Sequence, residues 1–154
     1  MTHATRIVAA VAVLVALAAG VPVQAQTPEI DALRERAEQG DAEAQHLLGL
    51  AYFNGEGVPQ DNPLAVRWWR SAAEQGHADG QYSLGFMYAN GRGVPQDYVQ
   101  GHMWFNLAAS RVTGADQTAA VSGRNEVAAL MTPEQIAEAQ RLAREWDEAH
   151  PRNP

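Results

Sequence analysis

The sequence contains no cysteine and no lysine. The lack of cysteine excludes disulfides, thiolate metal ligands, a cysteine nucleophile and a lipidated amino-terminal cysteine. The lack of lysine excludes a Ser-x-x-Lys catalytic motif. The eleven basic residues are therefore all arginines, and with eighteen acidic residues they give a formal net charge of −7 over 154 residues. A chain this acidic is not expected to bind nucleic acid, which normally requires a basic surface.

The first 25 residues are predicted to be a secretory signal peptide rather than part of the fold. Arg6 supplies a positive start, residues 7–20 form an apolar run, and Val23-Gln24-Ala25 provides small residues before cleavage after Ala25. The apolar run is shorter than the about 20 residues that a membrane-spanning helix needs. We therefore expect a periplasmic or secreted protein with no stable membrane span after cleavage. An uncleaved signal sequence that serves as the anchor of an envelope sensor is the alternative.

The rest of the chain is dominated by an internal repeat. Residues 54–61 read Asn-Gly-Glu-Gly-Val-Pro-Gln-Asp, and residues 90–97 read Asn-Gly-Arg-Gly-Val-Pro-Gln-Asp. When residues 37–72 are aligned with 73–108 without a gap, 18 of 36 positions are identical. Self-similarity at a fixed period of this length is the signature of a stacked repeat protein.

Each copy of the motif has the chemistry of a corner between two helices. Its glycines permit positive φ, its proline prevents the preceding helix from continuing, and the aspartate that follows is a good N-cap for the next helix. Apolar residues on both sides recur at spacings of three and four, which predicts amphipathic helices. Gly49 and Gly85 lie inside the predicted first helices, where we expect another helix to pass close by.

These patterns divide the chain into four parts. After the signal peptide, residues 26–40 form an N-terminal capping helix that begins at Thr27-Pro28, and residues 41–110 form two repeat units. Residues 111–154 form a degenerate third helix pair that serves as the C-terminal cap. Its last helix starts at Thr132-Pro133-Glu134-Gln135, the pattern of a capping box with proline at the first helical position.

The order Leu-Gly-x-x-Tyr, then Asn-Gly-x-Gly-Val-Pro-Gln-Asp, then Ala-x-x-Trp resembles the Sel-one-like repeat (SLR) family, relatives of the tetratricopeptide repeats. The resemblance covers residues 37–108, with one departure: Gly101 replaces Ala65 in the second unit, and we expect looser packing there. The resemblance implies an all-α fold, a right-handed solenoid of antiparallel helix pairs. Family members mostly serve as scaffolds or adaptors for other proteins. Some secreted members, typically cysteine-rich, have been linked to β-lactam or peptidoglycan chemistry.

No catalytic constellation is recognisable in the sequence. The serines lie outside Gly-x-Ser-x-Gly elbows, and the histidines lack the i, i+4 pairing of a helical metal site. The tryptophans follow core spacing, so we interpret them as packing residues rather than as a sugar or base platform. We predict no catalytic residue, no cofactor and no metal site. The residues considered were Ser71, Ser83, Ser110 and Ser122, His46, His77, His102 and His150, and Trp68, Trp69 and Trp104.

Comparison of the two units separates packing positions from positions free for other use. Identical positions are those that stacking needs, whereas one stripe on each first helix differs between the units. In the implied superhelix the first helices line the concave surface, so we predict a partner-binding groove there. Packing of these side chains between units is the alternative. The stripe consists of His46, Leu50 and Phe53 in the first unit and Tyr82, Phe86 and Ala89 in the second.

The function predicted from the sequence is a protein–protein interaction module of the bacterial envelope. It would bind an unidentified protein or peptide in the concave groove, and self-association is also compatible with a stack this short. A hydrolase that acts on β-lactams or peptidoglycan is the alternative, and it depends on the family resemblance alone.

Overall fold

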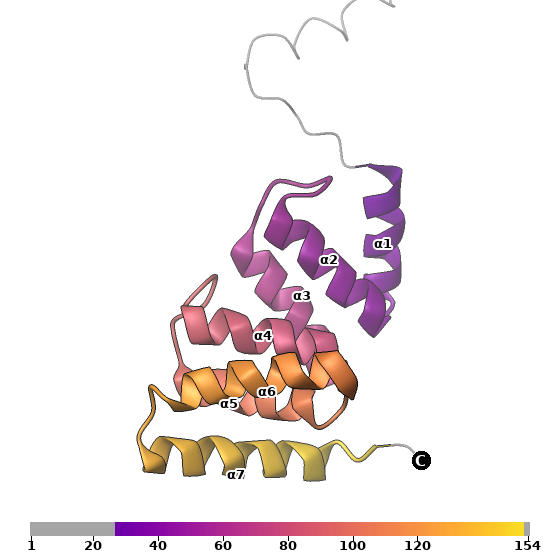
Figure 1. The fold of residues 1–154 in the computed structure, drawn as a ribbon. Coiled ribbons are helices and arrows are strands. Elements are labelled where there is room, and N and C mark those ends of the chain that lie inside the picture. The colour runs from indigo at the N-terminus through magenta and orange to yellow at the C-terminus, as the bar shows by residue number, and fades with distance from the viewer. Residues whose placement is uncertain (1–26, 153–154) are drawn as a thin grey trace, which may run out of the picture.

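The computed structural model describes residues 27–152, which form seven α-helices and no strand. The predicted signal peptide, residues 1–25, lies outside the described residues. The helices follow one another along a stack that begins at α1 and ends at α7, as Figure 1 shows. The all-α solenoid of antiparallel helix pairs is confirmed. The helices are α1 (Pro28–Glu38), α2 (Ala42–Asn54), α3 (Asn62–Glu74), α4 (Ala78–Asn90), α5 (Tyr98–Ala109), α6 (Gly114–Ala128) and α7 (Pro133–Ala149).

The predicted aspartate N-caps are confirmed. A carboxylate oxygen of Asp41, Asp61 or Asp97 accepts a hydrogen bond from the backbone N–H three residues later, at 3.1, 2.9 and 3.0 Å respectively. Thr132 caps α7 in the reciprocal capping box expected with Gln135. Each such bond satisfies one of the four N–H groups that a helix start leaves unpaired.

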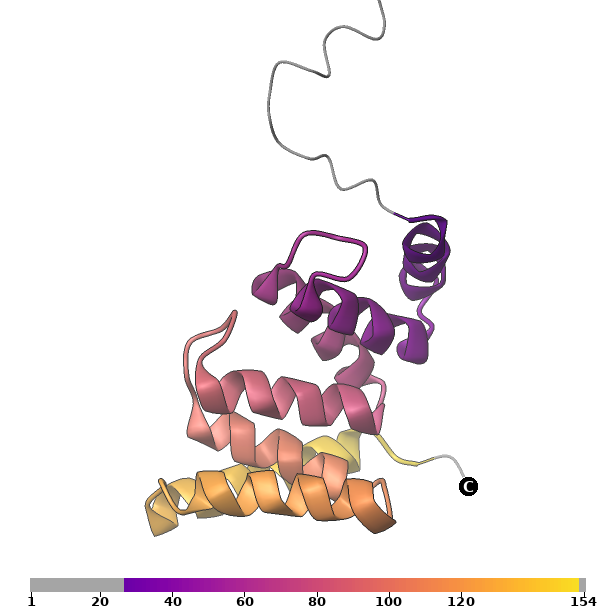
Figure 2. The ribbon, with the colours of Figure 1, turned by 45° about the horizontal axis from the view of Figure 1, so that its top comes forward.

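The two corners have the same construction. Each first helix ends at a glycine in the left-handed region, Gly55 at φ 73° and Gly91 at φ 61°. The side-chain amides of Gln60 and Gln96 then donate to the carbonyl oxygens of Phe53 and Ala89, at 2.7 and 2.9 Å. Both corners project from the same side of the stack (Figures 1 and 2).

Helix α1 contacts α2 in the way that α3 contacts α4. Arg34 of α1 donates to the hydroxyl of Tyr52 at 3.3 Å, and Arg70 of α3 donates to the hydroxyl of Tyr88 at 2.7 Å. Because the two arginines are 36 residues apart, α1 occupies the place of the second helix of a preceding unit. This is the role expected of a capping helix.

The two helix-interior glycines lie where large rings cross the helix, as predicted. A Cβ on Gly49 would lie 2.4 Å from Nε1 of Trp69, and one on Gly85 would lie 3.1 Å from Cδ1 of Phe105. The expectation of looser packing at Gly101 is wrong. A Cβ at Gly101 would lie 3.3 Å from both the Cβ and the backbone nitrogen of Ala89, so α4 and α5 approach closely there.

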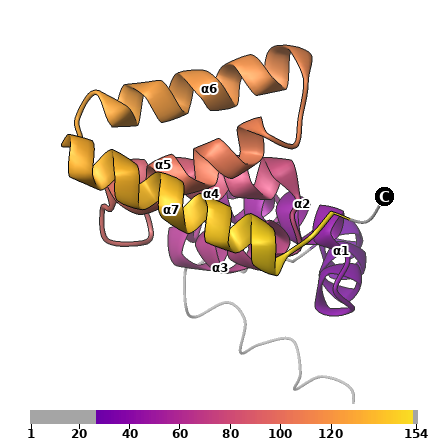
Figure 3. The same cartoon turned by 90° about the horizontal axis from the view of Figure 1, so that it is seen from below.

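The carboxyl-terminal helices both pack against α5. Helices α6 and α7 form where the sequence places the third pair, but they diverge from the short connection at residues 129–132 (Figure 3). Trp146 of α7 meets Trp104 edge-on at 5.9 Å between ring centroids, and Arg111 donates to Asp147 at 2.7 Å. Within residues 27–152, no helix has the length and apolar character to cross a membrane.

Candidate functional site

The structure divides the six predicted groove residues between two places. Tyr82, Phe86 and Ala89 of α4 line one cavity together. Leu50 and Phe53 of α2 pack, partly buried, against the main hydrophobic core. His46 is 9% exposed and lies beside His77, with 5.3 Å between their ring centroids. The cavity and the histidine pair are therefore two separate places in the fold.

The cavity lies between α4, α5 and α6 and has a volume of about 580 Å³. Helices α4 and α6 are the first helices of consecutive units, and no residue of α2 lines the cavity. Its size falls within the range of about 300–1,000 Å³ typical of ligand pockets. Besides the three α4 residues, the walls include Tyr98 and Phe105 of α5 and Ser122, Gly123 and Glu126 of α6.

Aromatic rings form one wall of the cavity. Tyr82, which is 36% exposed, meets Phe105 edge-on at 5.3 Å between centroids. Gly123 allows α6 to approach this ring, because a Cβ there would lie 3.0 Å from Phe105 Cε1. Leu130, 64% exposed, also lines the cavity. The cavity therefore combines an aromatic wall with polar side chains, namely Asn90, Gln96, Ser122 and the carboxylate of Glu126.

Arg92 connects the two halves of the predicted stripe. Its guanidinium lies 4.5 Å from the ring centroid of Phe53 and 5.9 Å from that of Phe86. The two phenylalanine rings meet edge-on at 6.3 Å. A guanidinium over an aromatic face is attracted by the negative charge of the π system. The aromatic stripe therefore continues from unit one to unit two beneath a basic side chain from the second corner.

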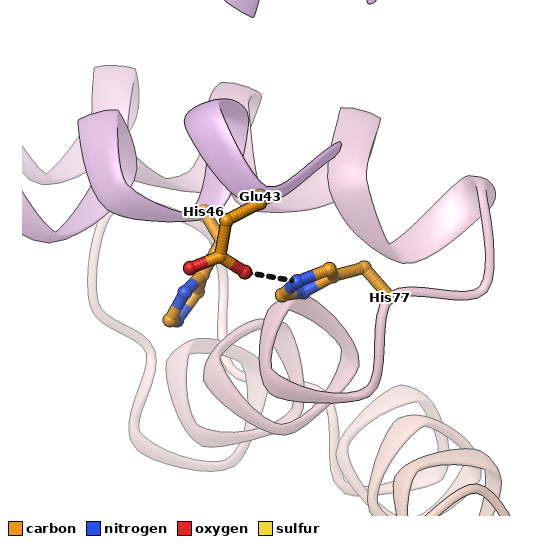
Figure 4. Close-up of side chains that lie close together, drawn as sticks. All are labelled: Glu43, His46 and His77. Carbon is orange, nitrogen blue, oxygen red and sulfur yellow. Dashed lines mark hydrogen bonds and ion pairs between the residues drawn. The ribbon is translucent and has the colours of Figure 1, made fainter. Parts of the chain in front are cut away.

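A second cluster joins Glu43, His46 and His77. Glu43 and His46 are neighbours on α2, whereas His77 is the N-cap of α4, and the three side chains point toward one another (Figure 4). His77 Nε2 lies 2.8 Å from Glu43 Oε2. One potential metal-ligating atom from each residue lies within 4.8 Å of the others.

One hydrogen bond indicates the tautomer of the neutral His77 ring. The backbone N–H of Gly80 donates to His77 Nδ1 at 3.2 Å, so that nitrogen carries a lone pair. In the neutral ring the proton then lies on Nε2, which donates to Glu43. An N-cap bond of this kind stabilises a helix by about 1 kcal/mol.

The surroundings of the neighbouring His46 favour its neutral form. Burial lowers the pKa of His46, because the charged ring would lose its hydration, and the positive charge of a protonated His77 would lower it further. The carboxylates of Asp79 and Glu43 act in the opposite direction. A neutral imidazole has a free lone pair, as a hydrogen-bond acceptor or a metal ligand requires.

Reasoning from the sequence missed this cluster. The histidines were tested for i, i+4 pairing on one helix, but His46 and His77 come from different helices and are 31 residues apart. A usable signal was present, since His77 replaces an aspartate N-cap and His46 lies three residues after Glu43. Only the stacking of α4 on α2 brings the two positions together.

Comparison with known proteins identifies the repeats. Residues 42–77 and 78–111 match the model of the Sel1 repeat. No curated protein matches the chain.

Two solved structures from bacteria share the fold. The first is a protective antigen present in uropathogenic Escherichia coli strains that displays an SLR fold. It is 34% identical with a TM-score of 0.73, and the match covers 79% of this chain and 25% of that chain. The second is a Sel1 repeat protein from Oxalobacter formigenes, 44% identical with a TM-score of 0.53, and the match covers 56% of this chain and 25% of that chain. The chain thus spans about a quarter of the length of either structure.

Proposed function

Because this chain is a Sel1 repeat protein, and Sel1 repeats generally mediate protein interactions, we propose that it is an interaction module of the bacterial envelope. In this proposal it holds a segment of a partner protein against the first helices of its repeats, without catalysis and without a cofactor. The envelope location is supported by the signal-peptide pattern of residues 1–25.

The observation that carries the proposal is the cavity between α4, α5 and α6. Three of the six predicted groove residues, Tyr82, Phe86 and Ala89, line it. Aromatic side chains in a concave surface are frequent anchors of protein interfaces, because they offer a large contact area at a low cost in conformational entropy. We therefore place the partner segment at this cavity, which is lined by residues of α4, α5 and α6 and by none of α2.

The lining residues define the chemistry of the partner segment. The rings of Tyr82, Phe86 and Phe105 offer apolar contacts, and Glu126 offers a carboxylate. The whole chain has a formal charge of −7. A segment with a large apolar side chain next to a basic one matches this surface, because the apolar group fills the cavity and the basic group pairs with Glu126.

The experiment is a crosslinking pull-down from the native envelope fraction with a matched pair of variants. Ala119→Arg adds a long charged side chain at the cavity wall, and Ala137→Arg adds the same side chain at an exposed position of α7. We expect wild type and Ala137→Arg to retain the same partner, and Ala119→Arg and Tyr82→Ala to lose it.

Retention of the partner by Ala119→Arg would show that the cavity is not the binding site.

The alternative hydrolase is tested with the purified protein and nitrocefin, a chromogenic β-lactam. Sustained turnover that exceeds the rate of a buffer control would contradict a purely binding role.

A further inference from the structure

The cluster of Glu43, His46 and His77 has no part in the proposed groove. Its potential ligand atoms lie within 4.8 Å of one another, and His77 Nε2 lies 2.8 Å from Glu43 Oε2. Two of the side chains come from α2 and the third from the start of α4, so the cluster lies at the junction of the two repeats (Figure 4). We propose that it binds a zinc ion.

Repeat stacking does not require this cluster. The positions 36 residues later in the chain carry Asp79, Tyr82 and Thr113 in place of Glu43, His46 and His77. The junction between the second unit and α6 therefore has no histidine at either position, yet the helices stack there. This set of three side chains is thus specific to one junction, and stacking of the helices does not depend on it.

The environment of His46 provides a second observation. Its side chain is 9% exposed, and its ring nitrogens make no hydrogen bond to any residue between 27 and 152. Neither ring nitrogen is fully buried, so an ion can reach them from solvent. The carboxylates of Glu43 and Asp79 contribute negative charge near the ring, which favours a cation there.

The donor set suits zinc. Two imidazole nitrogens and one carboxylate oxygen are ligands that zinc accepts, and its filled d shell imposes no preferred geometry on the site. Three protein ligands leave a fourth position for water or for a group from a partner. The ligand set contains no thiolate, in agreement with a chain that lacks cysteine.

Zinc binding would change the hydrogen bonding of His77. In the structure Nδ1 accepts the N–H of Gly80, which places the proton of the neutral ring on Nε2. Coordination through Nε2 requires this proton to move to Nδ1, so no net proton is released and the bond from Gly80 is lost. Zinc binding and capping of α4 therefore compete, and the N–H of Gly80 reports on the site.

The test is isothermal titration calorimetry of the full chain, without an affinity tag and freed of metal by a chelator, with zinc chloride. We expect saturable binding of one zinc ion per chain. Loss of an outer-shell partner already weakens metal sites by about 10–100-fold, so loss of a ligand should weaken this one by at least about tenfold. The ligand variants are Glu43→Gln, His46→Tyr and His77→Ser.

These variants are chosen to preserve the fold, which circular dichroism verifies. Tyrosine is the residue that the second unit carries at the position of His46, and serine is a favoured N-cap. His150→Gln, which removes an exposed histidine outside the cluster, is the matched control and should bind zinc as wild type does.

Amide hydrogen exchange measured by NMR provides the second readout. We expect zinc to accelerate exchange of the Gly80 N–H in wild type and to leave it unchanged in His46→Tyr. The proposal is overturned if zinc binding does not saturate, if the three ligand variants bind like wild type, or if His150→Gln weakens binding as much as they do. Each readout is independent of any protein partner.

Discussion

The side-chain amide of Gln81 donates a hydrogen bond to the carbonyl oxygen of Ala73 at 3.2 Å. The same bond joins Gln45 to Ala37 at 3.0 Å and Gln117 to Ala109 at 3.2 Å. The three glutamines are spaced 36 residues apart. The repeat therefore extends into α6, where little sequence identity remains, and each glutamine ties a first helix to the end of the helix before it.

Replacement of these glutamines by methionine, which has a similar shape, should have unequal effects. Gln45 also accepts a bond from Gln75 at 2.8 Å, whereas Oε1 of Gln81 is buried without a partner. With about 1 kcal/mol for each bond, we expect Gln45→Met to lower the free energy of unfolding by about 2 kcal/mol, and Gln81→Met by less than about 1 kcal/mol. Urea unfolding measures both, and an equal or larger loss for Gln81→Met would contradict this account.

The variant Gly49→Ala should destabilise the protein although alanine favours helices. Its Cβ would lie 2.4 Å from Nε1 of Trp69, which donates to the carbonyl oxygen of His46 at 3.1 Å. Displacement of the indole breaks this buried bond, so we expect a loss of about 3 kcal/mol in the free energy of unfolding. Gly85→Ala is the comparison, because a Cβ there would lie no closer than 3.1 Å to its nearest neighbour, Cδ1 of Phe105. We expect this variant to lose less free energy of unfolding than Gly49→Ala. Chemical denaturation of both variants tests the order.

His102 should make the protein sensitive to acid. The ring is buried, its Nδ1 has no partner, and burial together with the nearby charge of Arg124 lowers its pKa. Below the ordinary histidine pKa of about 6.5, the unfolded chain binds a proton that the folded chain does not. The free energy of unfolding should therefore fall with pH below about 6.5, by at most about 1.4 kcal/mol per pH unit from this residue.

The control for His102 comes from the first unit, which carries Val66 at the equivalent position. The variant His102→Val leaves a volume defect that does not depend on pH. Between pH 7 and pH 5, the free energy of unfolding should fall more steeply for wild type than for His102→Val. The stability of the variant relative to wild type should therefore increase as the pH falls. A constant difference between the two proteins would show that His102 does not titrate in this range.

The contact between Arg111 and Asp147 should hold α7 in place. The arginine side chain is 9% exposed, donates to Asp147 at 2.7 Å and lies 4.8 Å from the ring centroid of Trp146. Since Asp147 is 38% exposed, solvent screens the pair, and we expect Asp147→Ala to cost about 1–2 kcal/mol. Hydrogen exchange should accelerate in α7 but not in α2 and α3, because each element of a solenoid contacts only its neighbours. A uniform change along the chain would argue against this local role.

The sequence alone was sufficient for the features that depend on neighbours along the chain. Helix starts at Asp41, Asp61 and Asp97 were predictable because an N-cap acts on the backbone three residues later. The corners were predictable because left-handed glycines and a proline stop a helix locally. The period of 36 residues then implied stacking, since each helix pair exposes an apolar face that only another pair can cover.

Tertiary structure alone decided which side chains from different helices meet. Gly101 looked like a packing defect in the sequence, but the approach of α4 leaves no room for a larger residue there. Helix α7 packs on α5 rather than closely on α6, although only residues 129–132 separate α6 from α7. Glu43 and His46 meet His77 only after α4 stacks on α2. Such contacts depend on crossing geometry between helices, which no local pattern in the sequence records.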